Sequence, residues 1–492
     1  MSTKTIPSEI LGIECRHVTH ISANYETETE DVHLIKEQVH YANGLILPRL
    51  TVRKNFKRDF YVTKKGYRNH KQKKDWESIE KLDKYSCTQS ELTRACGRML
   101  DTPYIKDLRE LTKSPYLYGV DVESRSIIRK EYFESNKVLL PSPTRSTVAA
   151  LDIETDMVTG DDEDGSEIIM ASITFKNRSY TAVLKRFVKD LPDYEGKVNA
   201  AVEKHIGDIL RKREVVPVIE YVDTPHEIIK RCFQKAHQWM PDYISIWNVT
   251  FEMERFLDDA RCNDYDLSSL ISDPSVPFKY RKLTFKPGKH QKVTASGKFT
   301  PVKPHNRWPV IEATAGFKIV CSMCTYRHIR LAKQEESSYA LDAILEKEVQ
   351  ITKLKIPEAD AYKAADWHFF MQAKMKPEYI AYNIFDCIAL EILDEKTSDL
   401  GRGLPTNLAY SDSSLFGSQP SRTVESEHFY TLEHNYVMAC ASPEMKQPID
   451  DMIYPLKGWI VALRAHLIAD NGMRCIEENS NIRTNVHSHV AD

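Results

Sequence analysis

Apolar and polar residues follow two different periods through the middle of the chain. Short runs in which almost every residue is apolar predict buried strands, whereas apolar residues spaced three and four apart predict amphipathic helices. The strands predicted in this way are residues 148–155, 168–175, 180–184, 215–221, 243–247 and 317–323. The predicted helices are residues 225–240, 256–261, 326–331, 338–349, 360–373 and 377–393. Strands and helices in alternation are typical of an α/β domain, whose sites lie at the ends of its strands.

The flanking regions have a less regular pattern. Residues 75–112 carry apolar positions among charges at helical spacing, and we predict helices there. Beyond Thr397 the chain is rich in glycine and proline, and short strands are predicted at residues 452–454 and 459–463. A chain of 492 residues is too long for one core, so we expect roughly two to four domains.

Composition constrains the compartment and the partners. The net charge is only −3, which argues against a protein that simply coats nucleic acid. The ten cysteines are scattered, which favours free thiols in a reducing cytoplasm. Neither a signal-peptide pattern nor an apolar run of membrane-spanning length is present in the sequence. We therefore expect a cytoplasmic protein, in the host cytoplasm if it is viral, with no membrane partner.

One cysteine pair has the spacing of a metal or redox motif. Cys321 and Cys324 form a C-x-x-C, but no second Cys or His pair stands at zinc-like spacing. We expect these two residues to pack where a strand ends and a helix begins, rather than to bind zinc.

Positive charge is concentrated in two segments. Between residues 49 and 74 the cations are interleaved with aromatic residues, as on surfaces that bind phosphates and stack bases. The alternative is a solvated basic face whose aromatic residues belong to the core. Between residues 280 and 308, lysines and turn signals predict an exposed basic hairpin. The candidate DNA contacts in the two segments are Arg53, Lys54, Lys57, Arg58, Lys286, Lys289, Lys292 and Lys298.

The predicted strand 148–155 ends in two carboxylates, Asp152 and Glu154. Alternate side chains of a strand share a face, so these two point the same way. Neighbouring buried carboxylates repel each other and are costly to desolvate, unless divalent cations neutralise them. Oxygen ligands of this kind suit Mg²⁺ or Mn²⁺. The alternative is a strand that runs out into an acidic surface loop, because Asp156 and four further acids follow it.

Two further candidate acids lie on other elements. Asp386 lies within an apolar helix, and Tyr382 shares its face one turn earlier. Glu252 follows the predicted strand 243–247. The four acids could converge on a pair of metal ions, one of which lowers the pKa of a water while both stabilise charge on the reacting oxygens. The Tyr382 hydroxyl could aim that water.

These residues belong to three motifs whose order resembles the proofreading exonuclease of phage-type family B DNA polymerases. The motifs are D-x-E at Asp152-Ile153-Glu154, an N-x₂–₃-(F/Y)-D motif at Asn248-Val249-Thr250-Phe251-Glu252, and Y-x₃-D at Tyr382-Asn383-Ile384-Phe385-Asp386. The resemblance implies a DEDDy exonuclease with a ribonuclease H-like α/β fold. It implies that Asp152, Glu154, Glu252 and Asp386 hold two Mg²⁺ or Mn²⁺ ions, that Tyr382 orients the water, and that Asn248 and Phe251 contact DNA. The basic hairpin falls where family members carry a hairpin that helps to separate the primer strand.

The resemblance also implies domains and partners. The expected parts are a mixed α+β N-terminal domain at residues 1–145, the exonuclease domain at 146–398, and a segment at 399–492 that connects to the N-terminal domain and leads into the polymerase palm. The expected partners are DNA, as a single-stranded 3′ end or a primer–template, a second chain that supplies palm, fingers and thumb, and a sliding clamp.

The chain departs from the family pattern in two respects. Glu252 stands where the family has an aspartate, and a misplacement of ~1 Å can cost ~100-fold in rate, so we expect weakened hydrolysis. The polymerase motifs D-x₂-S-L-Y-P, K-x₃-N-S-x-Y-G and D-T-D are not present in full, and residues 451–455 only echo the first. We therefore expect one half of a split polymerase, or a truncated product, without its own nucleotidyl-transfer site.

Three functions follow from these observations. The leading hypothesis is the N-terminal part of a replicative family B DNA polymerase, which removes 3′-terminal nucleotides in a two-metal reaction. A free-standing DEDDy exonuclease is the second. The third is a catalytically weak DNA-binding or assembly subunit of the polymerase, in which Glu252 is a sign of lost activity.

Overall fold

A computed structural model describes most of the chain. The described residues are 9–136, 144–158, 167–293, 298–302, 307–331, 333, 335–352, 354–408 and 410–440. They form two compact units, which we describe separately. The first contains the described residues of 1–57 and 123–426, and the second those of 58–122 and 427–492. Within the described residues, no helix is both long and apolar enough to cross a bilayer.

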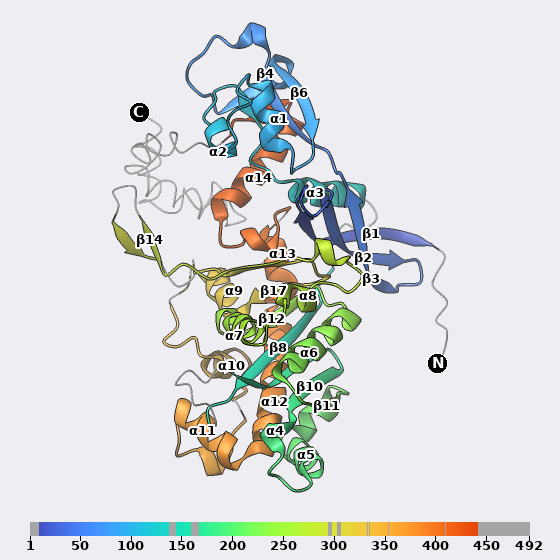
Figure 1. The fold of residues 1–492 in the computed structure, drawn as a ribbon, viewed down its shortest axis with the longest axis vertical. Helices are drawn as coiled ribbons and strands as arrows, with labels where there is room; N and C mark the ends of the chain where they lie inside the picture. Colours follow the sequence, from blue (N-terminus) through green and yellow to red (C-terminus); the bar gives the residue numbers. More distant parts are fainter. Residues whose placement is uncertain are drawn as a thin grey trace, which may run out of the picture. The chain divides into compact units, whose positions relative to one another are not determined.

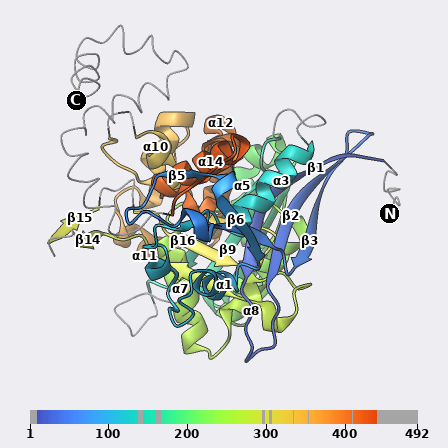
Figure 2. The same cartoon turned by 90° about the horizontal axis from the view of Figure 1, so that it is seen from above.

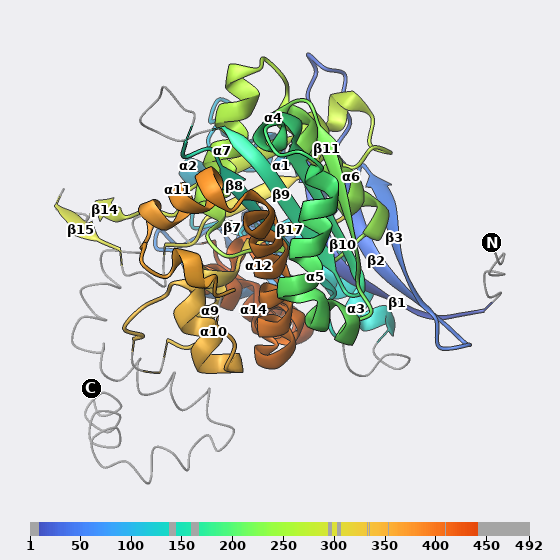
Figure 3. The same ribbon diagram turned by 90° about the horizontal axis from the view of Figure 1, so that it is seen from below.

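A six-stranded sheet forms the centre of the first unit (Figures 1 and 3). In spatial order its strands are β11 (Val216–Val222), β10 (Arg178–Leu184), β9 (Ile168–Phe175), β8 (Val148–Thr155), β12 (Tyr243–Ile246) and β17 (Lys318–Cys321). The strands β8, β9 and β10 form an antiparallel meander, whereas β12 and β17 continue parallel to β8, and β11 is parallel to β10. The predicted strands agree with these bounds to within two residues, and the α/β class is confirmed.

Helices cover both faces of this sheet. The helix α6 (Pro225–Trp239) packs against β9 and β10, and α12 (Lys376–Thr397) packs against β8 and β9. All eight residues of β9 are buried, as expected for a strand that is covered on both faces. The helix α5 (Tyr194–Lys212) lies along α12. The other helices of this region are α4 (Lys185–Val188), α7 (Val249–Cys262), α8 (Leu267–Ile271), α9 (Ser322–Ile329), α10 (Leu341–Val349) and α11 (Ala365–Lys374).

The helix boundaries follow from local chemistry. Thr224 precedes α6 and accepts a hydrogen bond from the Glu227 N–H at 3.3 Å, and Pro225 occupies the first turn. The helix α7 begins at Val249, after a two-residue turn that follows β12, which is earlier than the sequence predicted. Glu252 therefore lies in the first turn of a helix rather than in a loop.

A smaller antiparallel sheet belongs to the same unit. It contains β1 (Ile10–Ile21), β2 (Val32–Tyr41) and β3 (Ile46–Lys54), and α3 (Ser124–Asn136) packs along β1 (Figure 2). Two short ladders make up the basic segment. The strand β13 (Leu283–Lys286) pairs with β16 (Val310–Ala313), and β14 (Gln291–Val293) pairs with β15 (Phe299–Pro301). The predicted basic hairpin is thus confirmed in the described part of the segment.

The second unit is built on short strands. The strands β4 (Arg58–Thr63), β6 (Leu82–Cys87) and β7 (Leu117–Tyr118) form one sheet, and β5 (Trp76–Ser78) pairs with β18 (Tyr436–Met438). The helices are α1 (Leu92–Met99) and α2 (Leu108–Leu111). The prediction of helix throughout 75–112 is therefore wrong for residues 76–78 and 82–87. In β6, more buried and more exposed side chains alternate from Asp83 to Cys87, and β4 pairs with the whole strand.

After α12 the chain forms short helical elements. These are a π-helical turn (Asp399–Gly403), α13 (Leu404–Leu408), a 3₁₀ turn (Ser413–Leu415) and α14 (Gln419–Glu433). The strands predicted at 452–454 and 459–463, and the echo of a polymerase motif at 451–455, lie outside the described residues.

Candidate active site

The strand β8 presents the D-x-E pair inside the first unit. Asp152 is half-buried and Glu154 is buried. On one side of β8, Asp152 is opposite Ser172 of β9. On the other side, residues 148–150 pair with β12, whose end leads into α7. Two carboxylates are thus held at the end of a central strand, as the sequence predicted.

One face of α12 lies over these carboxylates. Tyr379, Tyr382, Asn383 and Asp386 are spaced three and four apart, so they project from the same side of the helix. The Asn383 side-chain amide donates to Asp152 Oδ2 over 2.7 Å. The Tyr379 hydroxyl donates to Glu154 Oε2. These two hydrogen bonds attach α12 to both acids of β8.

A second layer of hydrogen bonds holds Tyr379. His368 Nδ1 lies 2.8 Å from the Tyr379 hydroxyl oxygen, and Gln372 Nε2 lies 3.3 Å from the same atom. Gln372 also donates to the carbonyl of Thr155 over 2.8 Å, and its Oε1 accepts from the Met157 N–H over 2.8 Å. Gln372 of α11 therefore holds the end of β8 and also contacts Tyr379 of α12.

Tyr382 is almost completely buried among the acids. Burial raises its pKa well above the ordinary value, and the negative charges of Asp386, Glu154 and Asp152 add to this effect. The Tyr382 ring is parallel to that of Tyr379, with 5.9 Å between the ring centroids. The Trp367 ring also packs on Tyr382, with 4.8 Å between the centroids. The Tyr382 phenol therefore stays protonated at neutral pH, in the form that can donate a hydrogen bond to a water.

Asp386 and Glu252 complete the group of acids. Asp386 is buried in α12 and interacts electrostatically with Tyr382. Burial raises the pKa of Glu252 well above the ordinary value, and Cys321 and Glu154 raise it further. Glu252 Oε2 is buried and has no hydrogen-bond partner among the described residues. A cation next to this oxygen would satisfy it and favour the ionised carboxylate.

The donor set fits a hard divalent cation. Asp152, Glu154, Glu252 and Asp386 offer only carboxylate oxygens, which suit Mg²⁺ or Mn²⁺. Glu154 interacts electrostatically with Glu252, and Tyr382 does so with Asp152, Glu154 and Asp386. Within the described residues, however, the one trio of possible ligands whose donor atoms lie within 4.8 Å of one another is elsewhere, at His20, Asp31 and His33. Like-charge repulsion opposes a closer approach of the four acids, and bound cations would offset it.

The predicted DNA contacts next to this site are exposed. Asn248 precedes α7, and Phe251 lies in the first turn of that helix. The Arg255 guanidinium stacks on the Phe251 ring, with 5.4 Å between the guanidinium carbon and the ring centroid. In the basic hairpin, Lys286, Lys289 and Lys298 are exposed. The Lys292 side chain lies outside the described part of the structure.

The earlier basic segment separates into different environments. Arg53 is half-buried and pairs with Glu131 at 2.6 Å, while the exposed Lys54 pairs with Glu30 at 2.5 Å. Lys57 is exposed. Arg58 is buried in the second unit and donates to the carbonyls of Gly119, Val120 and Val122. The assignment of Arg58 to a DNA surface is therefore wrong, because backbone oxygens of its own unit already occupy its guanidinium.

The C-x-x-C pair lies where it was expected. Cys321 ends β17 and Cys324 lies in α9. A hydrogen bond between the two thiols lowers the pKa of Cys321 and raises that of Cys324. Both are buried, and Cys321 lies close enough to Glu252 to raise the pKa of that carboxyl.

Several residues of the site were missed at the level of sequence. These are Tyr379, Asn383, His368 and Gln372. A signal was available for the first two, because polar side chains at positions 379, 382, 383 and 386 mark one face of an otherwise apolar helix. No spacing rule links His368 and Gln372 to Tyr379, because those contacts depend on how α11 packs against α12.

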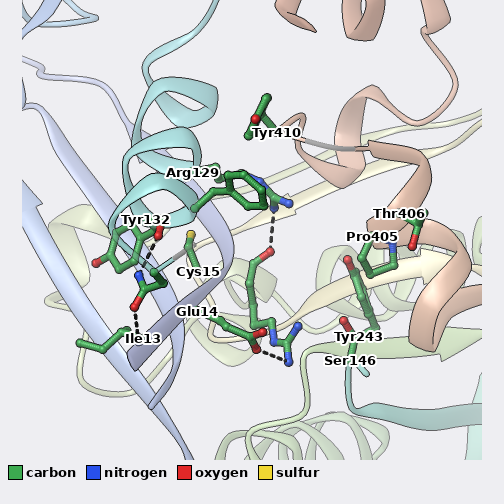
Figure 4. A pocket seen from close by; sticks show the side chains of 13 residues that line it. Ile13, Glu14, Cys15, Arg129, Tyr132, Ser146, Tyr243, Pro405, Thr406 and Tyr410 are labelled. Atoms are coloured by element: carbon green, nitrogen blue, oxygen red, sulfur yellow. Dashed lines mark hydrogen bonds and ion pairs between the residues drawn. The ribbon is translucent and has the colours of Figure 1, made fainter. Parts of the chain in front are cut away.

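A separate pocket lies in the same unit (Figure 4). It has a volume of about 330 Å³, and Glu14, Arg16, Arg129, Tyr132 and Tyr243 are among its lining residues. Arg129 donates to the Arg16 carbonyl over 2.7 Å at its edge. None of the candidate catalytic residues lines this pocket.

Comparisons with known proteins add no assignment. A scan against protein-family models found no match, and a search of curated proteins found none either.

Proposed function

We propose that this chain carries a metal-dependent 3′–5′ exodeoxyribonuclease, the proofreading part of a family B-type DNA polymerase. The observation that carries the proposal is the arrangement of Asp152, Glu154 and Asp386 around a buried, protonated Tyr382. The three motifs come from a strand end, a helix start and a mid-helix position that are far apart in sequence. An antiparallel β8–β9–β10 meander extended by parallel β12 and β17 is consistent with a ribonuclease H-like fold.

Asp152, Glu154 and Asp386 would hold the divalent cations, with Glu252 as a fourth ligand. When bound, the cations would supply a water of lowered pKa and stabilise charge on the attacking and leaving oxygens. Tyr382 would donate a hydrogen bond to that water and aim it at the terminal phosphodiester. Asn383 and Tyr379 would orient the Asp152 and Glu154 carboxylates.

DNA is the substrate that this site fits best. Asn248 and Phe251 are exposed at the start of α7, which also carries Glu252, so they could contact the 3′-terminal nucleotide. Phe251 presents a ring on which a base can stack. The exposed lysines of the hairpin would bind phosphates further along the strand. The proposed partners are a second chain that supplies palm, fingers and thumb, and a sliding clamp.

One observation favours a second candidate, a catalytically weak DNA-binding or assembly subunit. Burial holds the pKa of Glu252 well above its ordinary range, so its proton must leave before the carboxylate can bind a cation. In this alternative DNA would bind with little hydrolysis.

The two candidates separate in one assay. The purified chain is incubated with 5′-labelled single-stranded DNA and with a mismatched primer–template, in Mg²⁺ or in chelator. The proposal expects shortening from the 3′ end that chelator and the Asp152→Ala/Glu154→Ala variant both abolish. DNA binding without metal-dependent shortening would support the assembly subunit and contradict the exonuclease.

A further inference from the structure

A cluster of two histidines and one aspartate lies in the small sheet of the first unit, away from the candidate active site. His20 of β1 and His33 of β2 are opposite each other in the register, and Asp31 directly precedes β2. Asp31 Oδ2 lies 3.0 Å from His20 Nε2, and Asp31 Oδ1 lies 3.7 Å from His33 Nδ1. Asp31 and His33 are fully buried, and the His20 side chain is 16% exposed.

The His33 ring is held so that one nitrogen is left for a ligand. Its Nε2 lies 2.7 Å from Ser124 Oγ, at the start of α3, which lies beside β1 (Figures 1 and 2). The Phe56 ring packs edge-on against the His33 ring, with 5.7 Å between the ring centroids. The other nitrogen, Nδ1, is buried, points toward Asp31 and has no hydrogen-bond partner among the described residues. Metal-binding histidines are typically fixed in this way, through a hydrogen bond from the nitrogen that does not bind the metal.

Two cations near His33, Arg53 and Arg125, have acidic partners of their own. Arg53 pairs with Glu131 at 2.6 Å, and Arg125 pairs with Glu123 at 2.6 Å and with Glu312 at 2.7 Å.

We propose that His20, Asp31 and His33 bind one divalent transition-metal ion of the Zn²⁺ class, with Ser124 positioning His33. One donor atom from each of the three residues lies within 4.8 Å of the other two, close enough for a single ion to reach all three after a small rearrangement. In this structure, His20 Nε2 and Asp31 Oδ2 are hydrogen-bonded at 3.0 Å. Two imidazoles favour zinc or iron over magnesium and calcium.

The ion would be structural. It would join β1 to the turn that leads into β2, and it would offset the buried charge of Asp31. Because an unfolded chain does not hold the three ligands together, binding would stabilise the folded state. This site is independent of the proposed nuclease function.

The test uses the full chain with Asp152→Ala and Glu154→Ala, so that the acids of the candidate active site contribute little binding. The protein is stripped with chelator, incubated with Zn²⁺, Co²⁺, anaerobic Fe²⁺ or Mg²⁺, and desalted. Metal per chain is then measured by mass spectrometry, and Co²⁺ binding by its visible absorption. We expect about one equivalent of Zn²⁺ or Fe²⁺, a Co²⁺ spectrum of low coordination number, and no retained Mg²⁺.

Variants assign the metal to the cluster. Asp31→Asn and His33→Gln should lose the metal, and Ser124→Ala should weaken binding by about 10- to 100-fold while the chain stays folded. The matched control is His40→Gln, a histidine of the same strand whose Nε2 contacts Glu14 at 3.2 Å, and it should retain the metal. The proposal is overturned if the parent chain retains no transition metal, or if Ser124→Ala and Asp31→Asn bind as tightly as the parent.

Discussion

Asn383 donates a hydrogen bond to the Asp152 carboxylate over 2.7 Å, although the two residues are 231 positions apart. The bond connects the face of α12 to the end of β8, and it restricts the orientation of the acid that begins the D-x-E pair. A similar bond from Tyr379 restricts Glu154. The acids of the candidate site are thus held by the same helix that supplies Asp386.

Removing the Asn383 amide should weaken metal binding at the site. In Asn383→Ala, Asp152 loses the hydrogen bond from Asn383 and its orientation is less restricted, so we expect about 10- to 100-fold lower hydrolysis at low Mg²⁺, with partial recovery at high Mg²⁺. The measurement is exonuclease rate against Mg²⁺ concentration. Asn263→Ala, at the far end of α7, serves as the control. An unchanged Mg²⁺ dependence in Asn383→Ala would contradict the positioning role.

Shortening Glu252 should increase activity. Glu252→Asp restores the acid that the resembling family has at this position, and we expect it to be faster than the wild type by roughly 10-fold or more. Glu252→Gln, of the same size but without charge, should be slower than both. The wild-type rate should also rise with pH more steeply than the Glu252→Gln rate, because burial holds the Glu252 proton to higher pH. A Glu252→Asp variant no faster than wild type would refute this explanation.

The hairpin lysines should determine the salt dependence of DNA binding. Replacing Lys286, Lys289 and Lys298 with alanine removes up to three phosphate contacts, so the slope of log affinity against log salt should fall by about 2 on single-stranded DNA. Fluorescence anisotropy between low and moderate salt measures the slope. A triple variant of exposed lysines on α5, at positions 197, 204 and 212, is the matched control. Equal losses in the two triple variants would exclude a specific role for the hairpin.

A buried carboxyl near the end of α12 should make stability depend on pH. Burial raises the pKa of Glu391 to about 7, although Arg213 lies 3.1 Å from it. Between its ordinary pKa and about 7, the folded state holds a proton that the unfolded chain has lost, so stability falls as pH rises through this window. The expected loss is on the order of 3 kcal/mol.

Glu391→Gln should remove this loss. The variant should exceed the wild type in stability at pH 8, and the difference should disappear near pH 4.5, as measured by chemical unfolding at both pH values. Glu395→Gln is the control, since Glu395 pairs with the same arginine but is exposed. A Glu391→Gln variant that is less stable than wild type at pH 8 would show that the Arg213 ion pair outweighs the cost of burial.

Local patterns predicted those parts of the molecule that depend on local chemistry. An apolar run ending in Asp152 and Glu154 formed a central strand, and the helical spacing of Tyr382 and Asp386 placed both on one face of α12. Each of these inferences needs only the period of a strand or a helix. The order of the strands in the sheet required tertiary contacts that the sequence alone did not specify.

The errors and omissions concern contacts between distant segments. Arg58 has the sequence context of a surface cation, but it is buried because carbonyls at positions 119, 120 and 122 accept its hydrogen bonds. The segment 82–87 forms a strand because β4 pairs with it. The cluster of His20, Asp31 and His33 requires the register of β1 against β2, which no spacing rule supplies.

The central claim is that the acids around Tyr382 hydrolyse DNA from its 3′ end. The most direct measurement follows release of a 3′-terminal labelled nucleotide from single-stranded DNA in Mg²⁺, in parallel with the same DNA labelled at its 5′ end. We predict that the wild type releases the 3′ label as a mononucleotide while the 5′ label stays on shortened strands. Asp386→Asn should release neither, and Glu391→Gln on the same helix should act like wild type. Equal release by wild type and Asp386→Asn, or release from the 5′ end first, would contradict the account.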